Sequence, residues 1–158
     1  MKKLLGTIAI LLLFLSNVNA NERENKLNNL FKQLKNSEAS SAVKIENKIW
    51  KIWSTHPSNN DKGLNLTKLL AQGSFLMSGK ELNKAYEIFS KIILTDPNWS
   101  EAWNKRATVL YLLGRYEQSQ KDIDEVLKLE KRHFGALSGQ GLVQIELKNY
   151  EKAINSYI

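Results

Sequence analysis

The fold of this chain is decided by one stretch, WNKRATVLYLLGRYEQSQKDIDEVLKLE, which covers residues 103–130. Its first half places Trp103 and Ala107 on one apolar stripe at helical spacing, and its second half returns with another stripe that begins at Tyr116. Gly114 separates the two halves, and glycine commonly ends a helix by turning the chain. The stretch therefore predicts two antiparallel amphipathic helices joined by a tight turn.

The same pattern repeats along the chain with a period of 34 residues. A period of this length is typical of helix-turn-helix repeats. Two columns hold small residues and three hold large apolar ones, because a small side chain lets two helices approach while a bulky one fills the space opposite. The columns are Leu69, Trp103 and Leu137; Gly73, Ala107 and Gly141; Leu82, Tyr116 and Tyr150; Ala85, Ser119 and Ala153; and Phe89, Ile123 and Tyr157.

These columns resemble the tetratricopeptide repeat (TPR) family, and the match runs over residues 66–158. In the middle unit Trp103, Ala107, Gly114 and Tyr116 fit the family pattern. The resemblance implies an all-α fold, namely a right-handed superhelical stack of antiparallel helix pairs, the TPR solenoid. A generic helical bundle whose apolar stripes coincide is the alternative, and the regular spacing argues against it.

The resemblance further implies three repeat units, at residues 66–99, 100–133 and 134–158, of which the last is incomplete. The sequence departs from the family pattern at two turns within the units, where Lys80 and Lys148 take the position of glycine. Because a side chain disfavours the left-handed backbone of such turns, we expect these two turns to be distorted.

The third unit ends part-way through its second helix, without the polar capping helix that solenoids need for solubility. An apolar stripe at Tyr150, Ile154 and Tyr157 would then be exposed. Three interpretations stay open: the array continues beyond Ile158, a partner covers the stripe, or the last helix frays.

A helical hairpin over residues 21–57 is predicted to precede the array and to cap it. Residues 21–26 are polar and are expected to be disordered. Trp50 and Trp53 lie on the apolar stripe of the second helix, and we interpret them as packing residues and not as a recognition surface. The His-Pro pair at the end of the hairpin should stop that helix, and residues 58–63 should form a polar loop.

The first twenty residues predict a secretory signal peptide. Lys2 and Lys3 form a positive start, residues 4–15 an apolar stretch, and small residues precede a cleavage position after Ala20. A helix that crosses a bilayer needs about 20 residues, so this stretch favours cleavage over an anchor at the inner membrane. We therefore expect an exported, periplasmic bacterial protein with no stable membrane span.

The composition argues against thiol chemistry, metal binding and cofactor binding. The 158 residues include no cysteine and two histidines far apart, so we predict no thiol chemistry, no metal site and no cofactor. The net charge of +7 falls to +5 without Lys2 and Lys3, and the basic residues form no run of five, so nucleic acid is not an expected partner.

Two polar features of the sequence are not interpreted as functional sites. Asp122, Asp124 and Glu125 are adjacent on one helix, point to different sides, and are interpreted as a solvated face. His133 at the start of a helix is a minor candidate for an anion-binding corner, and a plain turn between repeats is the preferred interpretation.

The resemblance implies a concave groove lined by the first helix of each unit. We expect it to bind a peptide or partner protein, so that the chain is a non-catalytic interaction scaffold of the bacterial cell envelope and not an enzyme. Asn104 and Lys105 would supply polar donors, and Met77 and Tyr111 apolar contacts. The alternatives are an accessory subunit of an envelope enzyme complex and a binder of an anionic surface. The candidate groove residues are Leu70, Ser74, Met77, Asn104, Lys105, Thr108, Tyr111, Ser138, Leu142 and Ile145.

Overall fold

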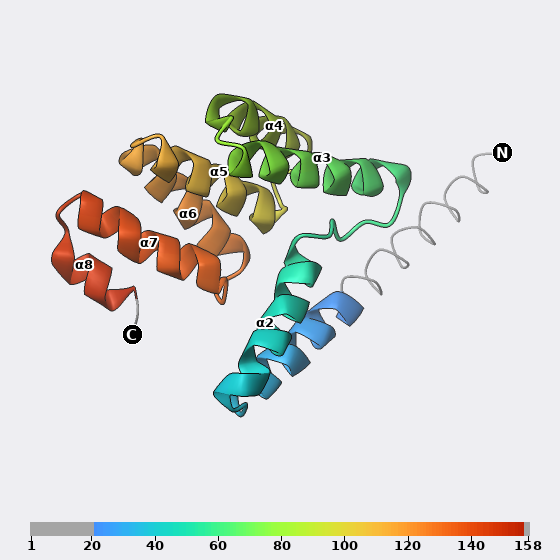
Figure 1. The fold of residues 1–158 in the computed structure, drawn as a ribbon. Helices are drawn as coiled ribbons and strands as arrows, with labels where there is room; N and C mark the ends of the chain where they lie inside the picture. Colours follow the sequence, from blue (N-terminus) through green and yellow to red (C-terminus); the bar gives the residue numbers. More distant parts are fainter. Residues whose placement is uncertain (1–20, 157–158) are drawn as a thin grey trace, which may run out of the picture. The chain divides into compact units, whose positions relative to one another are not determined.

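The computed structural model describes residues 21–156, and this part of the chain contains helices and no strand (Figure 1). The all-α prediction is therefore confirmed. The predicted signal peptide at 1–20 and Tyr157 lie outside the described residues. No described helix combines the length and the apolar character that crossing a membrane requires. The helices are a first helix at 21–35, α2 (Ala39–Trp53), α3 (Asp61–Ser78), α4 (Leu82–Thr95), α5 (Ser100–Leu112), α6 (Tyr116–Leu129), α7 (Phe134–Glu146) and α8 (Tyr150–Asn155).

The chain divides into two compact units, Met1–Leu64 and Asn65–Ile158. In the described part of the first unit, the first helix and α2 form the predicted hairpin. The packing interpretation of the tryptophans holds, since Trp53 is buried and Trp50 packs edge-on against it with ring centroids 5.5 Å apart. The ring of Phe31 lies 5.9 Å from that of Trp53 and joins the two helices.

Two sequence-based expectations about the first unit are wrong. Residues 21–26 are helical and not disordered, and Arg23 Nη2 donates a hydrogen bond of 2.6 Å to the carbonyl of Ile52, which ties this turn to α2. The loop expected at 58–63 ends early, because the Asn60 side chain accepts a hydrogen bond of 2.9 Å from the N–H of Gly63 and caps α3 at Asp61.

The second unit is built from helix pairs, α3 with α4, α5 with α6, and α7 with α8, in the order expected of the repeat (Figure 1). The small residues of both small columns are buried, so they lie where two helices approach closely. Phe89 and Ile123, from the column of large residues, are buried beside them. The buried small residues are Gly73, Ala107, Gly141, Ala85, Ser119 and Ala153.

The three turns within the repeat units share one geometry, so the expectation of distortion at Lys80 and Lys148 is wrong. Lys80 has φ of 62°, Gly114 of 71° and Lys148 of 61°. In each turn the next residue's N–H reaches back five positions, as Arg115 N–H does to the Leu110 carbonyl at 2.9 Å. The left-handed residue donates in turn to the carbonyl three positions before it. These paired hydrogen bonds hold the lysines in a conformation that glycine adopts more easily.

Candidate functional site

A pocket of about 200 Å³ opens in the second unit, and α5, α6 and α7 line it. Its floor is apolar or small and buried, with Ala107, Ile123 and Val143 among the floor residues. The full lining is Asn104, Ala107, Thr108, Tyr111, Ser119, Ile123, Gly135, Ser138, Gly139, Leu142 and Val143.

The pocket exists because α7 carries two glycines, Gly135 and Gly139, four residues apart on the side that lines it. A β-carbon added at Gly139 would meet nothing nearer than the Ile123 Cδ1 atom at 3.6 Å, so space is left there. Neither glycine was among the predicted groove residues. Their signal was present, since glycine within a helix is unfavourable and indicates a close approach or an opening.

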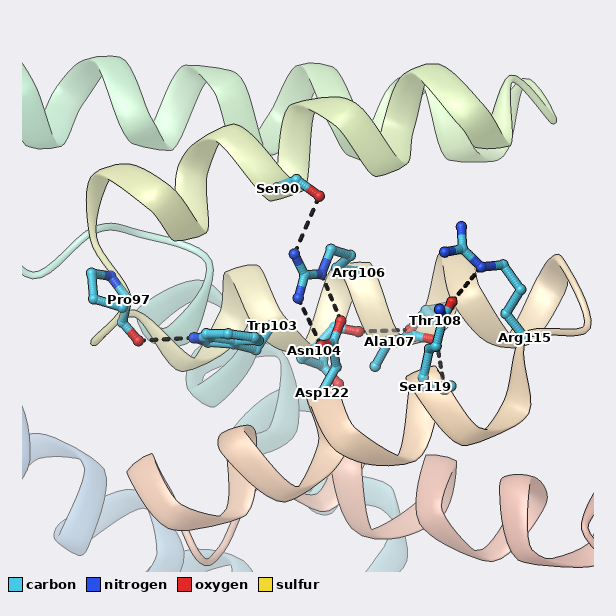
Figure 2. Close-up of polar contacts among 11 residues, drawn as sticks. Ser90, Pro97, Trp103, Asn104, Arg106, Ala107, Thr108, Arg115, Ser119 and Asp122 are labelled. Atoms are coloured by element: carbon cyan, nitrogen blue, oxygen red, sulfur yellow. Dashed lines mark hydrogen bonds and ion pairs between the residues drawn. The ribbon is translucent and has the colours of Figure 1, made fainter.

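The polar groups around the pocket are largely satisfied within the chain (Figure 2). The Ser119 hydroxyl donates to the Ala107 carbonyl at 2.8 Å, and the Thr108 hydroxyl to the Asn104 carbonyl at 3.0 Å. The ring of Tyr111 packs against that of Tyr116 with centroids 5.6 Å apart. The surface that the pocket offers a ligand is therefore mainly apolar.

The structure brings five of the ten predicted groove residues together in this pocket: Asn104, Thr108, Tyr111, Ser138 and Leu142. Leu142 is 43% exposed. Ile145, one turn further along α7, is 47% exposed but does not line the pocket.

The three predicted groove residues of α3 do not join this pocket. Leu70 is 2% exposed and belongs to the hydrophobic core, so it packs and offers no surface to a ligand. Met77 is half-buried against the same core. Ser74 is half-buried, and its hydroxyl donates to the Leu70 carbonyl at 2.8 Å.

Glu101 is a buried carboxylate that sequence reasoning missed. It contacts the Asn104 amide and the Lys105 ammonium, the two donors that were predicted to hold a ligand. Asn104 Nδ2 donates to Glu101 Oε2 at 3.2 Å, and Lys105 Nζ lies 3.2 Å from Glu101 Oε1. Asn104 and Lys105 therefore already have a partner within the chain, and their predicted role in holding a peptide stays a prediction. These two partners lie three and four residues from Glu101 on the same helix, a spacing at which side chains are neighbours.

His133 completes this cluster and is not an anion-binding corner. Its Nε2 lies 3.0 Å from Glu101 Oε2, and its Nδ1 accepts the N–H of Ala136 at 3.2 Å, which caps α7. Because Nδ1 is an acceptor, the ring proton is on Nε2 and is donated to the carboxylate. The preferred interpretation, a turn between repeats, agrees with this role.

The interpretation of Asp122 as part of a solvated face is also wrong, because Asp122 is buried. Arg106 donates to it through Nε at 2.7 Å and Nη2 at 2.8 Å, and through Nη1 to Ser90 Oγ at 3.2 Å (Figure 2). Burial lowers the pKa of Arg106, but the hydrogen bonds and charge of Asp122 outweigh it, and the pKa is raised.

Arg106 also links successive helix pairs through its contacts with aromatic rings. Its guanidinium carbon lies 4.9 Å from the ring centroid of Trp103 and 5.7 Å from that of Tyr86. The indole N–H of Trp103 donates in turn to the Pro97 carbonyl at 2.8 Å. One arginine therefore connects α4, α5 and α6, and this polar network fixes how successive pairs stack.

Within the described residues, no three side chains of histidine, aspartate or glutamate are grouped to hold a metal ion. The described part of the chain instead shows stacked helix pairs, an internally satisfied polar network and a mainly apolar surface pocket. These features define a helical-repeat scaffold.

Comparison with known proteins agrees with this class. The sequence profile of the tetratricopeptide repeat matches residues 100–133, the middle unit. A TPR repeat-containing protein of Rhizobium etli is 34% identical over 141 residues, which is 84% of this chain and 66% of that protein. The chain belongs to the tetratricopeptide-repeat family.

Two further relatives are more distant. Hsp70-Hsp90 organizing protein 3 of Arabidopsis thaliana is 26% identical over 86 residues, which is 54% of this chain and 15% of that protein. The crystal structure of the Sgt2 TPR domain from Aspergillus fumigatus superposes with a TM-score of 0.57 at 22% identity, over 59% of this chain and 62% of that one. The chain thus spans under two thirds of each. The TPR fold supports a role as a protein–protein interaction scaffold, and proteins with this fold are typically non-catalytic.

Proposed function

We propose that this protein is an interaction scaffold of the bacterial cell envelope that holds a segment of a partner protein at the pocket between α5 and α7. The pocket itself carries this proposal, because it is an apolar hollow in a surface where half of the predicted groove residues meet. Leu142 and Ile145 extend the apolar surface beside it along α7.

The lining defines what the partner supplies. Because the nearby amide, hydroxyl and ammonium groups are engaged within the chain, the partner contributes mainly an apolar side chain. The volume of about 200 Å³ suits one such side chain, since a dry protein cavity of about 150 Å³ accepts benzene. Burying apolar surface contributes about 25 cal/mol for each Å² removed from water. A leucine, methionine or phenylalanine of the partner is therefore the expected anchor.

The envelope location rests on residues 1–20, whose positive start, apolar stretch and small residues before position 21 are typical of a signal peptide. Cell fractionation followed by N-terminal sequencing tests it. A periplasmic chain that begins at Asn21 supports the location. A cytoplasmic chain that retains Met1 contradicts it.

Two variants that each replace a leucine with a lysine test the pocket. Leu142→Lys places an ammonium in the pocket lining, whereas Leu94→Lys changes a leucine of α4 that is 86% exposed and does not line the pocket. Each variant and the wild type carry a photo-crosslinking residue at Ser138, and partners are captured from envelope extract. We expect the same crosslinked partner for the wild type and Leu94→Lys, and its loss in Leu142→Lys.

Circular dichroism first establishes that both variants are folded. An unchanged crosslink in folded Leu142→Lys would rule out the pocket as the binding site. A crosslink from Ser138 that is lost equally in both variants would likewise contradict the proposal, because it would indicate a nonspecific effect of the added charge.

A further inference from the structure

A second and larger hollow lies in the first unit, between the first helix and α2. Its volume is about 690 Å³, within the range of ligand-binding clefts in proteins. The two helices run side by side, shown in blue and cyan in Figure 1. We call this hollow the hairpin groove. Its lining is Glu22, Arg23, Lys26, Asn29, Leu30, Gln33, Lys48, Lys51, Ile52, Thr55, His56, Pro57 and Asn59.

The polar side chains of the hairpin groove form two facing rows. Lys26, Asn29 and Gln33 follow one another at intervals of three and four residues along the first helix, so they share one face. Lys48 and Lys51 make the facing row on α2. A ligand in the groove would thus meet ammonium groups from both sides.

Within residues 21–64, the hairpin groove holds the whole excess of positive charge. Four basic residues and one acidic residue line it. Outside the groove, residues 21–64 contain four lysines and four acidic residues, which balance. The balancing residues are Lys32, Lys35, Lys44, Lys62, Glu24, Glu38, Glu46 and Asp61.

The lysines of the groove are exposed and available. In the described part of the chain, Lys26, Lys48 and Lys51 form no ion pair, although other lysines do, such as Lys84 with Glu81 and Lys128 with Glu125. Like charges brought to one concave surface repel each other, and an anionic ligand removes that repulsion.

Arg23 adds a partly buried positive charge to the groove. One of its five N–H donors bonds to the Ile52 carbonyl at 2.6 Å, which fixes the guanidinium between the two helices. Burial lowers the pKa of Arg23 from its ordinary value, and the charge of Glu24 partly opposes this effect. A guanidinium that has lost part of its water is stabilised by an approaching carboxylate.

We propose that the hairpin groove binds an acidic segment of a partner protein, whose carboxylates pair with Lys26, Lys48 and Lys51. Apolar side chains of the segment would contact the partly exposed Ile52 between the two rows. A peptide is favoured over a membrane, because the charges line a hollow, whereas a lipid surface is met by a flat or convex basic face. This site is separate from the pocket between α5 and α7, and neither proposal depends on the other.

The test uses the full chain and a fluorescein-labelled hexaglutamate peptide as the probe, with binding measured by fluorescence anisotropy. Lys26→Glu, Lys48→Glu and Lys51→Glu together reverse the groove charges. Lys32→Glu, Lys35→Glu and Lys44→Glu together make the same change of net charge on the same hairpin outside the groove. Hexaglutamine serves as the neutral probe, and vesicles of phosphatidylcholine with phosphatidylglycerol serve as the lipid probe.

We expect the groove variant to weaken hexaglutamate binding by at least about tenfold, and the matched variant by less than about threefold. Binding should weaken from about 50 mM to about 300 mM salt, and hexaglutamine should not bind. The variant Leu142→Lys should bind hexaglutamate as the wild type does. Equal losses in both triple variants, or binding of the vesicles without binding of hexaglutamate, would overturn the proposal.

Discussion

The ring of Phe89 lies against the backbone of Gly73, so close that a β-carbon at position 73 would sit 2.6 Å from Phe89 Cε1. Phe89 is completely buried and belongs to the core between α3 and α4. Real β-carbon contacts almost never fall below 3.0 Å, so any side chain at position 73 must displace the ring. The absence of a side chain at Gly73 is therefore what lets these two helices pack together.

Gly73→Ala should lower the free energy of unfolding by about 1–2 kcal/mol, because overpacking a core costs more than the gain in helix propensity. Gly139→Ala is the matched control. A β-carbon there meets only Ile123 Cδ1 at 3.6 Å, so this variant should gain about 0.5–1 kcal/mol. Urea denaturation followed by circular dichroism measures both. A Gly73→Ala variant as stable as Gly139→Ala would show that the packing argument is wrong.

Lys80→Gly and Lys148→Gly should each stabilise the protein by about 0.5–1 kcal/mol, because both lysines occupy left-handed backbone that costs a side chain about 1 kcal/mol. Gly114→Ala should be destabilising by a similar amount, about 1 kcal/mol, at the same turn position of the middle unit.

Lys121→Gly, at an exposed position within α6, is the control for the loss of a lysine and should cost about 1 kcal/mol. Thermal unfolding compares the four variants. If Lys80→Gly and Lys148→Gly lose stability as Lys121→Gly does, the left-handed conformation carries no cost in this protein.

The columns of the 34-residue repeat decide how much of the fold can be predicted from the sequence. Gly73 and Ala85 could be placed because each repeats at its position 34 residues later as another small residue. The turns at Lys80 and Lys148 could not be judged from residue type, because two hydrogen bonds around each turn outweigh the preference for glycine. Tertiary context overrides local propensity there.

The polar parts of the site could be predicted less well. Asp122 looked solvated because its partner Arg106 lies 16 residues away on another helix. Glu101 was missed because its contact with His133 spans 32 residues. Helical spacing reveals neighbours within one helix only, whereas these pairs depend on how helices pack. The hairpin groove was missed for the same reason, since its two rows lie on different helices.

Asp122→Asn should lower the free energy of unfolding by about 2 kcal/mol, because it leaves the Arg106 guanidinium without its paired charge in a largely buried site. Glu125→Gln is the control on the same helix. It breaks the exposed pair with Lys128 and should cost about 0.5 kcal/mol or less.

A double-mutant cycle with Arg106→Met measures the coupling between Arg106 and Asp122, which we expect to be about 1–3 kcal/mol. Additive effects of the two changes would show that the pair contributes nothing beyond its separate side chains. Chemical denaturation at pH 7 gives all of these values.

Glu130 should make the protein lose stability in acid. Burial raises the pKa of its carboxyl, but the hydrogen bonds and charge of Arg132, with a smaller contribution from His133, outweigh burial and hold the pKa below its ordinary 4.5. Arg132 donates to the carboxylate through its backbone N–H at 3.0 Å and through Nε and Nη2 at 2.8 Å. A depressed pKa in the folded state means that the contribution to stability is present above pH 4.5 and disappears as the pH falls through the folded value.

Glu130→Gln should therefore cost about 0.5–1 kcal/mol at pH 7 and almost nothing once the pH has fallen below the folded pKa of Glu130, since the pair with Arg132 is partly exposed. Glu87→Gln is the matched control, because Glu87 is exposed on α4 and forms no ion pair in the described part of the chain. Its difference from the wild type should stay small at every pH. The measurement is the urea midpoint at pH values from neutral to about 3. Because the expected stabilisation comes from the ionised carboxylate, a Glu130→Gln deficit that persists unchanged to the lowest pH would mean that Glu130 acts through packing and not through its charge.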